Sequence, residues 1–244
     1  MSGHSKWANI KHKKEKSDSA KAQAFTRVTR EIIIAAREGG PDPEGNFRLR
    51  LAIQNARSVN MPNDNIQRAI KRGSGGEDGA NLEQVTYEGY GPAGVAVIVE
   101  TMTDNRNRTA ADVRHLFSKY GGNLGENGCV AWMFNRKGYL VIEMEDKPFT
   151  EDQVSEWAIE GGAEDLEVSD GIIEIYTAPE DLQVVQEYLE SKGVEFAESE
   201  TTMIAQNEVT LDEQTAQRVA KLLDALEELD DVQKVHTNLA EDLE

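Results

Sequence analysis

The side chains best suited to chemistry in this chain are the cations of its first 75 residues. Residues 1–75 hold 15 Lys+Arg and 7 Asp+Glu, whereas residues 76–244 hold 11 and 38. Lysine-rich segments bind phosphate backbones because they release condensed counterions, and an arginine fork can make two hydrogen bonds to one phosphate. The asymmetry therefore predicts that the first 75 residues meet a polyanion and that the acidic remainder does not.

The first candidate surface is a lysine-rich segment over residues 4–16. It shows no clear apolar period, so we expect a flexible arm or a weak helix, with an aromatic residue that could stack on a base. The candidate nucleic-acid contacts are Lys6, Trp7, Lys11, His12, Lys13 and Lys14. A solvated tail without a binding role is the alternative interpretation of the same residues.

Three amphipathic helices should position the second set of cations. The first begins near residues 17–18 and ends at residues 39–41, the second spans about 46–59, and the third is expected to be capped by Asn63. The candidate phosphate contacts on these helices are Arg27, Arg30, Arg50, Arg57, Arg68, Lys71 and Arg72. They fall outside the apolar stripes, so we expect them on solvent faces. The alternative is that these are ordinary solvated helix faces without a binding role, because such faces carry the same residue types.

A smaller group of cations lies within the acidic remainder, at Arg106 and Arg108. The pattern places them where a strand turns into a helix over about 105–120, and backbone N–H groups at such a junction can hold an anion. The alternative is a helix cap whose arginines pair with nearby carboxylates.

The elements expected around these residues indicate an α+β multidomain fold. A glycine-rich run at residues 73–79 predicts a flexible hinge, and an apolar run at 129–134 predicts a strand around Cys129. Residues 137–206 have the order β-α-β-β-α-β, which is typical of ferredoxin-like domains. The predicted domains are residues 1–75 (three helices), residues 76–136 plus 207–244 (discontinuous, α+β), and residues 137–206 (ferredoxin-like, inserted in the second).

Several classes of function find no support in the sequence. No phosphate-binding Walker loop, dinucleotide fingerprint or catalytic constellation is present, so we predict a protein that is not an enzyme and has no cofactor. One cysteine and four histidines argue against a Cys/His zinc site and fit a reducing cytoplasm. No apolar run approaches membrane-spanning length and no secretory signal is evident, so we expect a cytoplasmic protein without membrane contact.

Several short motifs resemble those of the YebC/PmpR family, which includes the mitochondrial translational activator of cytochrome oxidase. They lie at residues 3–13, 48–50, 60–62, 69–73, 87–92, 103–109, 117–119 and 121–125. The resemblance implies a helical first domain, two α+β domains with the third inserted in the second, and a non-enzymatic cytoplasmic protein. Bacterial members are described as DNA-binding transcriptional regulators, and other members act on the ribosome.

Three hypotheses follow from the residues and the resemblance. The first is a DNA-binding transcriptional regulator with weak sequence specificity, because no helix-turn-helix recognition helix is evident. The second is a ribosome-associated translation factor whose basic end binds structured RNA. The third is a protein-interaction scaffold. In each, the acidic remainder would be available to a protein partner, and the oligomeric state is left open.

Overall fold

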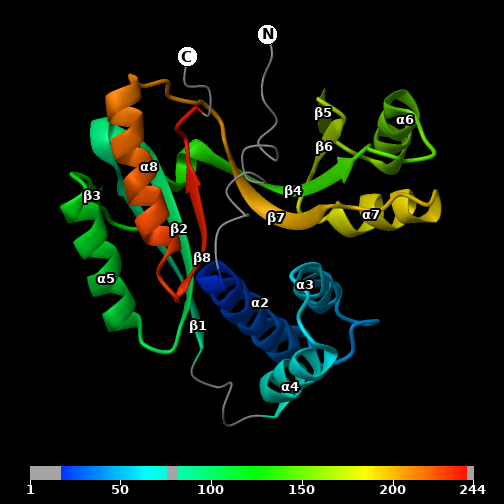
Figure 1. Cartoon of the computed structure of the whole chain (residues 1–244), viewed down its shortest axis with the longest axis horizontal. Coiled ribbons are helices and arrows are strands. Elements are labelled where there is room, and N and C mark those ends of the chain that lie inside the picture. The colour runs from blue at the N-terminus through cyan, green and yellow to red at the C-terminus, as the bar shows by residue number, and fades with distance from the viewer. Residues whose placement is uncertain (1–17, 76–81, 241–244) are drawn as a thin grey trace. The chain divides into compact units, whose positions relative to one another are not determined.

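A computed structural model describes residues 18–75 and 82–240 of the chain (Figure 1). The described residues form two compact units. The inserted unit is Asn135–Ile204, and the main unit comprises residues 18–134 and 205–240. The part of the chain described contains seven α-helices and two four-stranded sheets, which confirms the α+β multidomain fold.

Three helices at the start of the main unit form what we call the helical head. They are α2 (Asp18–Gly39), α3 (Phe47–Ser58) and α4 (Asn63–Ser74). Their apolar stripes meet in one core that includes Ile32, Leu49 and Ile66. Asn46 joins two of the helices, because its side chain accepts from Leu49 N at 3.0 Å and donates to Ala35 O at 2.8 Å. The three expected helices are thus present, although α4 begins after Pro62 without the side-chain cap expected from Asn63.

Helices α2 and α4 pack closely at Gly73. A Cβ atom added at this glycine would lie 2.3 Å from Ile33 O and 2.9 Å from Ala36 Cβ, both on α2. The missing side chain is therefore what lets the two helices approach. Gly73 is buried inside α4 and is not part of a hinge, which corrects the expected start of the linker. Residues 76–81 of that linker lie outside the described residues.

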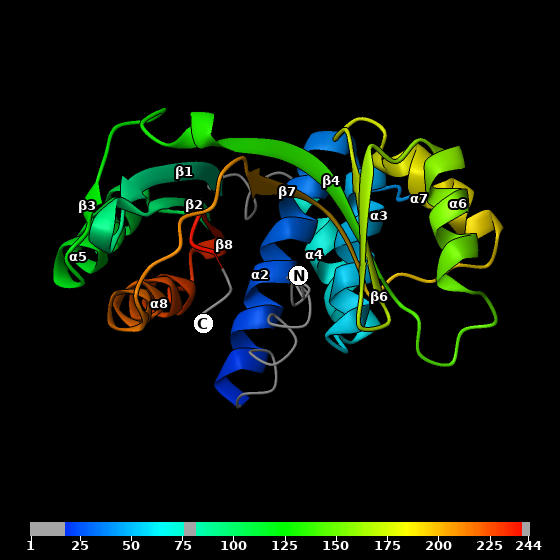
Figure 2. The same ribbon diagram turned by 90° about the horizontal axis from the view of Figure 1, so that it is seen from above.

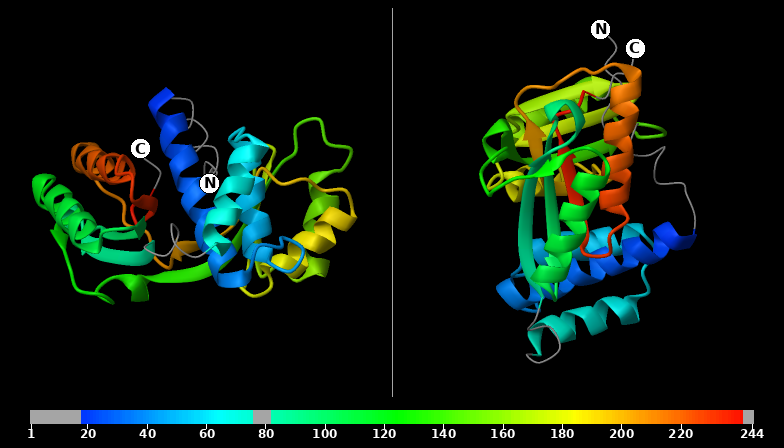
Figure 3. Two further views of the ribbon diagram at one scale, coloured as in Figure 1. Left: turned by 90° about the horizontal axis from the view of Figure 1, so that it is seen from below. Right: turned by 90° about the vertical axis from the view of Figure 1, so that its left-hand side faces the viewer.

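The rest of the main unit is a sheet with two helices on one face. Strands β1 (Glu83–Tyr90), β2 (Ala96–Thr103), β3 (Asn123–Leu124) and β8 (Val232–Thr237) lie in the order β3-β1-β2-β8. Helices α5 (Arg106–Lys119) and α8 (Glu213–Glu227) lie side by side over this sheet (Figures 2 and 3). Val97, Val113, Phe117 and Leu222 are buried in the core between them. Strand β8, which follows the inserted unit in the sequence, thus pairs with β2, which precedes it.

The expected strand over residues 129–134 does not form. A short 3₁₀ helix (Ala131–Met133) precedes strand β4, which runs from Phe134 to Glu143. Cys129 lies in a turn and is half-buried, and Trp132 is 67% exposed. An apolar run in the sequence does not distinguish a strand from a turn in which one apolar side chain is buried and the next is exposed.

The inserted unit contains β4, α6 (Glu151–Gly161), β5 (Asp165–Ser169), β6 (Ile172–Thr177), α7 (Leu182–Ser191) and β7 (Glu198–Ala205). The sheet order is β5-β6-β4-β7, with β6 antiparallel to both β5 and β4. A capping box fixes the start of α6, because Thr150 and Gln153 exchange side-chain to backbone hydrogen bonds. The element order is the one the sequence predicts for this segment.

Candidate nucleic-acid interface

Helix α4 presents three cations on one solvent face. Arg68, Lys71 and Arg72 are exposed, while Ile66, Ala69 and Ile70 on the opposite side of the helix are buried in the core of the head. Positions three and four apart are neighbours on a helix surface, so the three charges adjoin one another. We call Arg68, Lys71 and Arg72 the α4 cationic face.

A groove of about 740 Å³ borders this face. Its walls come from α2, α4, the residue before β1 and the residues between β2 and α5. The lining residues are Phe25, Thr26, Thr29, Arg30, Ile33, Met61, Asn65, Arg68, Ala69, Arg72, Leu82 and Asp104. Three arginines and one carboxylate, Asp104, thus line the groove, and Asp104 is paired with Arg108 at 2.9 Å. One of the arginines, Arg30, is paired with Asp231. The two arginines on α4 suit an anionic ligand.

Arg27 and Arg30 have internal partners, contrary to the expectation that they lie on a solvent face. Arg30 Nη2 lies 3.0 Å from Asp231 Oδ1, and Arg30 Nη1 donates to Met102 O at 3.0 Å. Arg27 donates to Glu227 O, and burial lowers the pKa of its guanidinium while Glu227 and Asp230 oppose that shift. Both side chains are half-buried because the segment between α8 and β8 packs on this face of α2. These contacts give the two arginines a role in joining the head to the sheet.

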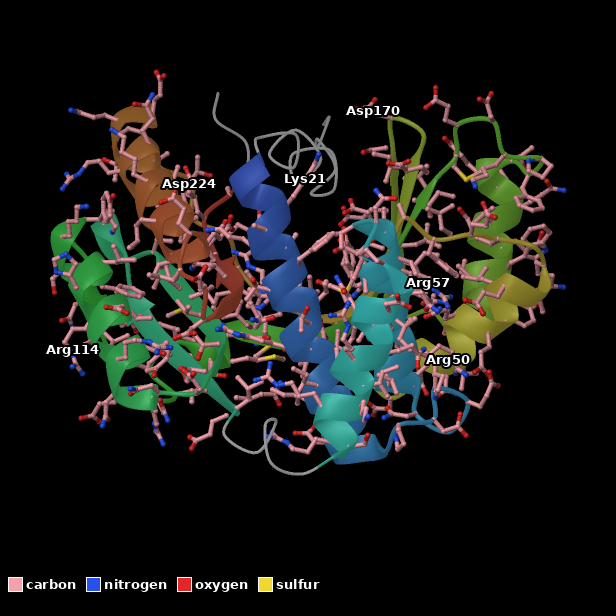
Figure 4. All side chains as sticks on the ribbon, turned by 60° about the horizontal axis from the view of Figure 1, so that its bottom comes forward. Lys21, Arg50, Arg57, Arg114, Asp170 and Asp224 are labelled. Atoms are coloured by element: carbon pink, nitrogen blue, oxygen red, sulfur yellow. The ribbon has the colours of Figure 1, made fainter. Side chains whose placement is uncertain are left out.

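The other predicted cations of the head lie on α3, where Figure 4 labels them. Arg57 is exposed, and Arg50 is half-buried with its guanidinium 5.4 Å from the centre of the Phe47 ring. Neither residue lines the groove. A role for either in nucleic-acid binding stays a prediction.

The junction before α5 is a capped helix start. Asn105 accepts from Arg108 N at 3.1 Å, and the Arg108 guanidinium pairs with Asp104 at 2.9 Å and Asp231 at 2.8 Å. Of the two alternatives for this segment, the structure shows the pairing with carboxylates for Arg108. Arg106 is exposed, and its predicted phosphate contact remains a prediction.

Asp231 joins these elements, a role that no sequence pattern indicates. The carboxylate is buried and accepts from Thr109 Oγ1 at 2.7 Å and Thr103 Oγ1 at 3.1 Å, besides its two arginines. Burial acts to raise its pKa, but Arg108, Thr109 and Arg30 outweigh burial and hold the pKa below its ordinary value. In the sequence, the residue looks like one member of a turn after a helix. Only the tertiary packing distinguishes it from Asp230, which is exposed.

The groove also includes residues that are not among the predicted contacts. Phe25 is half-buried and packs against the head core while lining the groove. Asn65, Thr26 and Thr29 add polar groups to the same lining. Residue type and spacing place Phe25 on the apolar stripe of α2, but they carry no signal that the stripe is uncovered at that end.

The predicted contacts of the arm lie outside the described residues: Lys6, Trp7, Lys11, His12, Lys13 and Lys14.

Within residues 18–75 and 82–240, no group of three or more His, Cys, Asp or Glu side chains could hold a metal ion. Helices of that same part of the chain are all too short or too polar to cross a membrane.

Two family models match the chain. The model described as the TACO1/YebC protein N-terminal domain matches residues 5–76, and the model described as the TACO1/YebC second and third domain matches residues 82–239. These matches divide the chain at the linker after the helical head.

Similar proteins span the same length. A probable transcriptional regulatory protein of Desulforamulus reducens is 53% identical over 99% of this chain and 100% of its own length. A protein of the same name from Moorella thermoacetica is 55% identical, covering 98% of this chain and 95% of its own. The crystal structure of a conserved hypothetical protein, Aq1575 from Aquifex aeolicus, superposes with a TM-score of 0.87 at 51% identity, covering 96% of each chain. The chain therefore belongs to the TACO1/YebC family, as its motifs indicated.

Proposed function

We propose that this protein is a non-enzymatic regulator that binds duplex DNA through phosphate contacts made by its helical head. The observation that carries the proposal is the α4 cationic face, where Arg68, Lys71 and Arg72 adjoin one another in solvent. The naming of its relatives as probable transcriptional regulatory proteins supports a role in regulation. Arginine and lysine suit phosphate oxygens by charge, and arginine also by geometry.

Contact with DNA should be confined to the head, to the lysine-rich residues before it and to Arg106 at the start of α5. Residues 76–244 carry a net charge of −27, so the remainder of the chain repels a polyanion over most of its surface. Phosphate contacts position a protein on DNA but carry no base information. We therefore expect similar affinity for duplexes of different sequence, and the acidic remainder would be free to bind a protein partner.

A second candidate is a ribosome-associated factor that binds structured RNA. The observation that favours it is the groove beside the α4 cationic face, because a concave site with an aromatic wall suits an exposed base better than a duplex backbone. Weak base reading by the rest of the head would be no handicap on ribosomal RNA.

The arm can be tested apart from the head. Replacing Lys11, Lys13 and Lys14 with glutamine should weaken binding similarly across sequences. Each lost phosphate contact should flatten the slope of log K against log[salt] by roughly 0.7–0.9. An unchanged slope would show that these three lysines make no phosphate contact.

Two binding assays at matched salt separate the candidates. A gel shift on promoter DNA measures the first, and co-sedimentation with ribosomes measures the second. Tight DNA binding without sedimentation supports the DNA-binding regulator, and the reverse supports the ribosomal factor. Binding in neither assay would contradict both and favour a protein-interaction scaffold.

A further inference from the structure

The groove beside the α4 cationic face differs chemically from that face. Its lining combines a half-buried aromatic residue, Phe25, and buried apolar residues with arginines and polar side chains. A duplex backbone is convex and fully charged, so it makes no use of an aromatic side chain in a groove. A nucleotide that has left a base stack offers both an apolar ring face and a phosphate.

Phe25 supplies the ring on which a base could stack. It is half-buried, since one part of the side chain packs against the core of the head while another lines the groove. The core contact fixes the ring without covering it, which lowers the entropy lost on binding. Stacking of a base on an aromatic side chain contributes about 1–3 kcal/mol.

Arg68 stands at the rim in a fixed position. Its Nε donates to Asp64 O at 3.2 Å, and its Nη2 donates to Asn65 Oδ1 at 2.7 Å. A guanidinium has five N–H donors, so these two bonds orient the group and leave donors for a phosphate. The same contact engages the oxygen of Asn65, so its amide N–H groups are not used in that bond.

The hydroxyl groups of Thr26 and Thr29 provide acceptors in the groove. Thr26 Oγ1 donates to Ala22 O at 3.1 Å, and Thr29 Oγ1 donates to Phe25 O at 2.6 Å. With each hydrogen directed to the helix backbone, the hydroxyl oxygen keeps lone pairs for a donor in the groove. The 2′-hydroxyl of ribose is such a donor, and deoxyribose lacks it.

Arg30 acts as the rear wall. Its guanidinium is engaged by Asp231 and by the carbonyl oxygens of Met102 and Asp230, so it is held in place and offers few new hydrogen bonds. The one carboxylate in the lining, Asp104, is paired with Arg108. The cations that would meet a phosphate are therefore those of α4.

We propose that this groove binds one unpaired nucleotide of an RNA strand, with the base on Phe25 and the phosphate on Arg68 and Arg72. The proposal rests on nucleic-acid binding by the head and names the ligand of the site beside it. The paired regions on either side of the unpaired nucleotide would lie along the α4 cationic face.

The test compares three labelled probes with the full-length protein: an RNA duplex with one bulged nucleotide, the same duplex without the bulge, and the bulged duplex made of DNA. We expect about tenfold tighter binding to the bulged RNA than to the paired RNA duplex, as one base stack would give, and about fivefold tighter binding than to the bulged DNA, as one sugar hydrogen bond would give. Phe25→Leu should abolish the preference for the bulged over the paired RNA duplex while leaving binding to the paired duplex unchanged. Phe47→Leu, an equal change on α3 outside the groove, should leave the preference intact.

A second variant covers the case in which Phe25→Leu perturbs the fold. This variant combines Thr26→Val and Thr29→Val, which keep the side-chain shape and remove both acceptors. It should bind bulged RNA and bulged DNA with equal affinity, with little change in melting temperature. Equal affinity of the wild-type protein for all three probes would overturn the groove proposal but would not contradict nucleic-acid binding by the helical head. Binding to none of the probes would overturn the proposed function as well.

Discussion

Arg30 Nη2 on α2 lies 3.0 Å from Asp231 Oδ1 on the segment before β8, two hundred residues later in the chain. The carboxylate also binds Arg108 on α5 at 2.8 Å, so one buried acid, next to the start of β8, joins the helical head to α5. Arg30 also lines the groove beside the α4 cationic face. The position of the groove wall therefore depends on this contact.

Asp231→Asn should destabilise the main unit by about 2–3 kcal/mol, because two arginines would lose their shared counter-charge in a buried setting. Denaturant unfolding followed by circular dichroism measures the change. Asp230→Asn is the matched control, since Asp230 is exposed and adjacent, and it should shift stability by less than about 0.5 kcal/mol. Equal effects of the two substitutions would show that Asp231 does not join the head to the sheet.

Stability should fall with acid partly through Glu88. This buried carboxylate accepts three backbone N–H bonds, from Gly128, Val130 and Ala131, at 2.7–2.9 Å. Burial acts to raise its pKa, but the three bonds together outweigh burial and lower it. A folded-state pKa below the unfolded one means that the stabilisation is complete above about pH 4.5 and is lost as pH falls through the folded value.

Glu88→Gln should therefore lower the free energy of unfolding at pH 7 and flatten its decline between about pH 5 and pH 3. Glu126→Gln, an exposed change in the same loop, should keep the wild-type slope. Urea titrations at a series of pH values give both quantities. A Glu88→Gln variant whose acid slope matches the wild type would contradict the assignment.

Gly73→Ala should destabilise the head by about 1–3 kcal/mol, the usual range for overpacking, because its Cβ would meet the Ile33 carbonyl oxygen at 2.3 Å. Gly45→Ala serves as the control, since the nearest atom to its added Cβ is 4.0 Å away. Thermal melting compares the two. If Gly73→Ala melts no lower than Gly45→Ala, the close contact between α2 and α4 is wrong.

The helices of the head could be predicted because each carries its own apolar period, as with Ile66, Ala69 and Ile70 on α4. Gly73 could not be assigned in the same way. In a sequence a glycine before Ser74 and Gly75 indicates a linker, whereas its role here is to admit the α2 backbone. Periodicity reports which face of a helix is apolar, not which other segment lies within reach of it.

The candidate site likewise combines residues whose exposure could be predicted from the sequence with residues whose exposure could not. Arg68, Lys71 and Arg72 were predicted correctly as exposed, because the core of their own helix determines their side. Arg27 and Arg30 were predicted on a solvent face and are half-buried, because a segment from the far end of the chain covers them. That contact depends on the tertiary fold, which no local pattern encodes.

The salt dependence of duplex DNA binding tests most directly whether the α4 cationic face holds phosphates. The variant combines Arg68→Gln, Lys71→Gln and Arg72→Gln. Its control combines Arg114→Gln, Arg218→Gln and Lys221→Gln, which removes the same charges from exposed positions on α5 and α8. We expect the slope of log K against log[salt] to flatten by about 2–3 in the α4 variant, at roughly 0.9 per contact, and to stay near the wild-type value in the control. Equal slopes in both variants would contradict phosphate binding by this face.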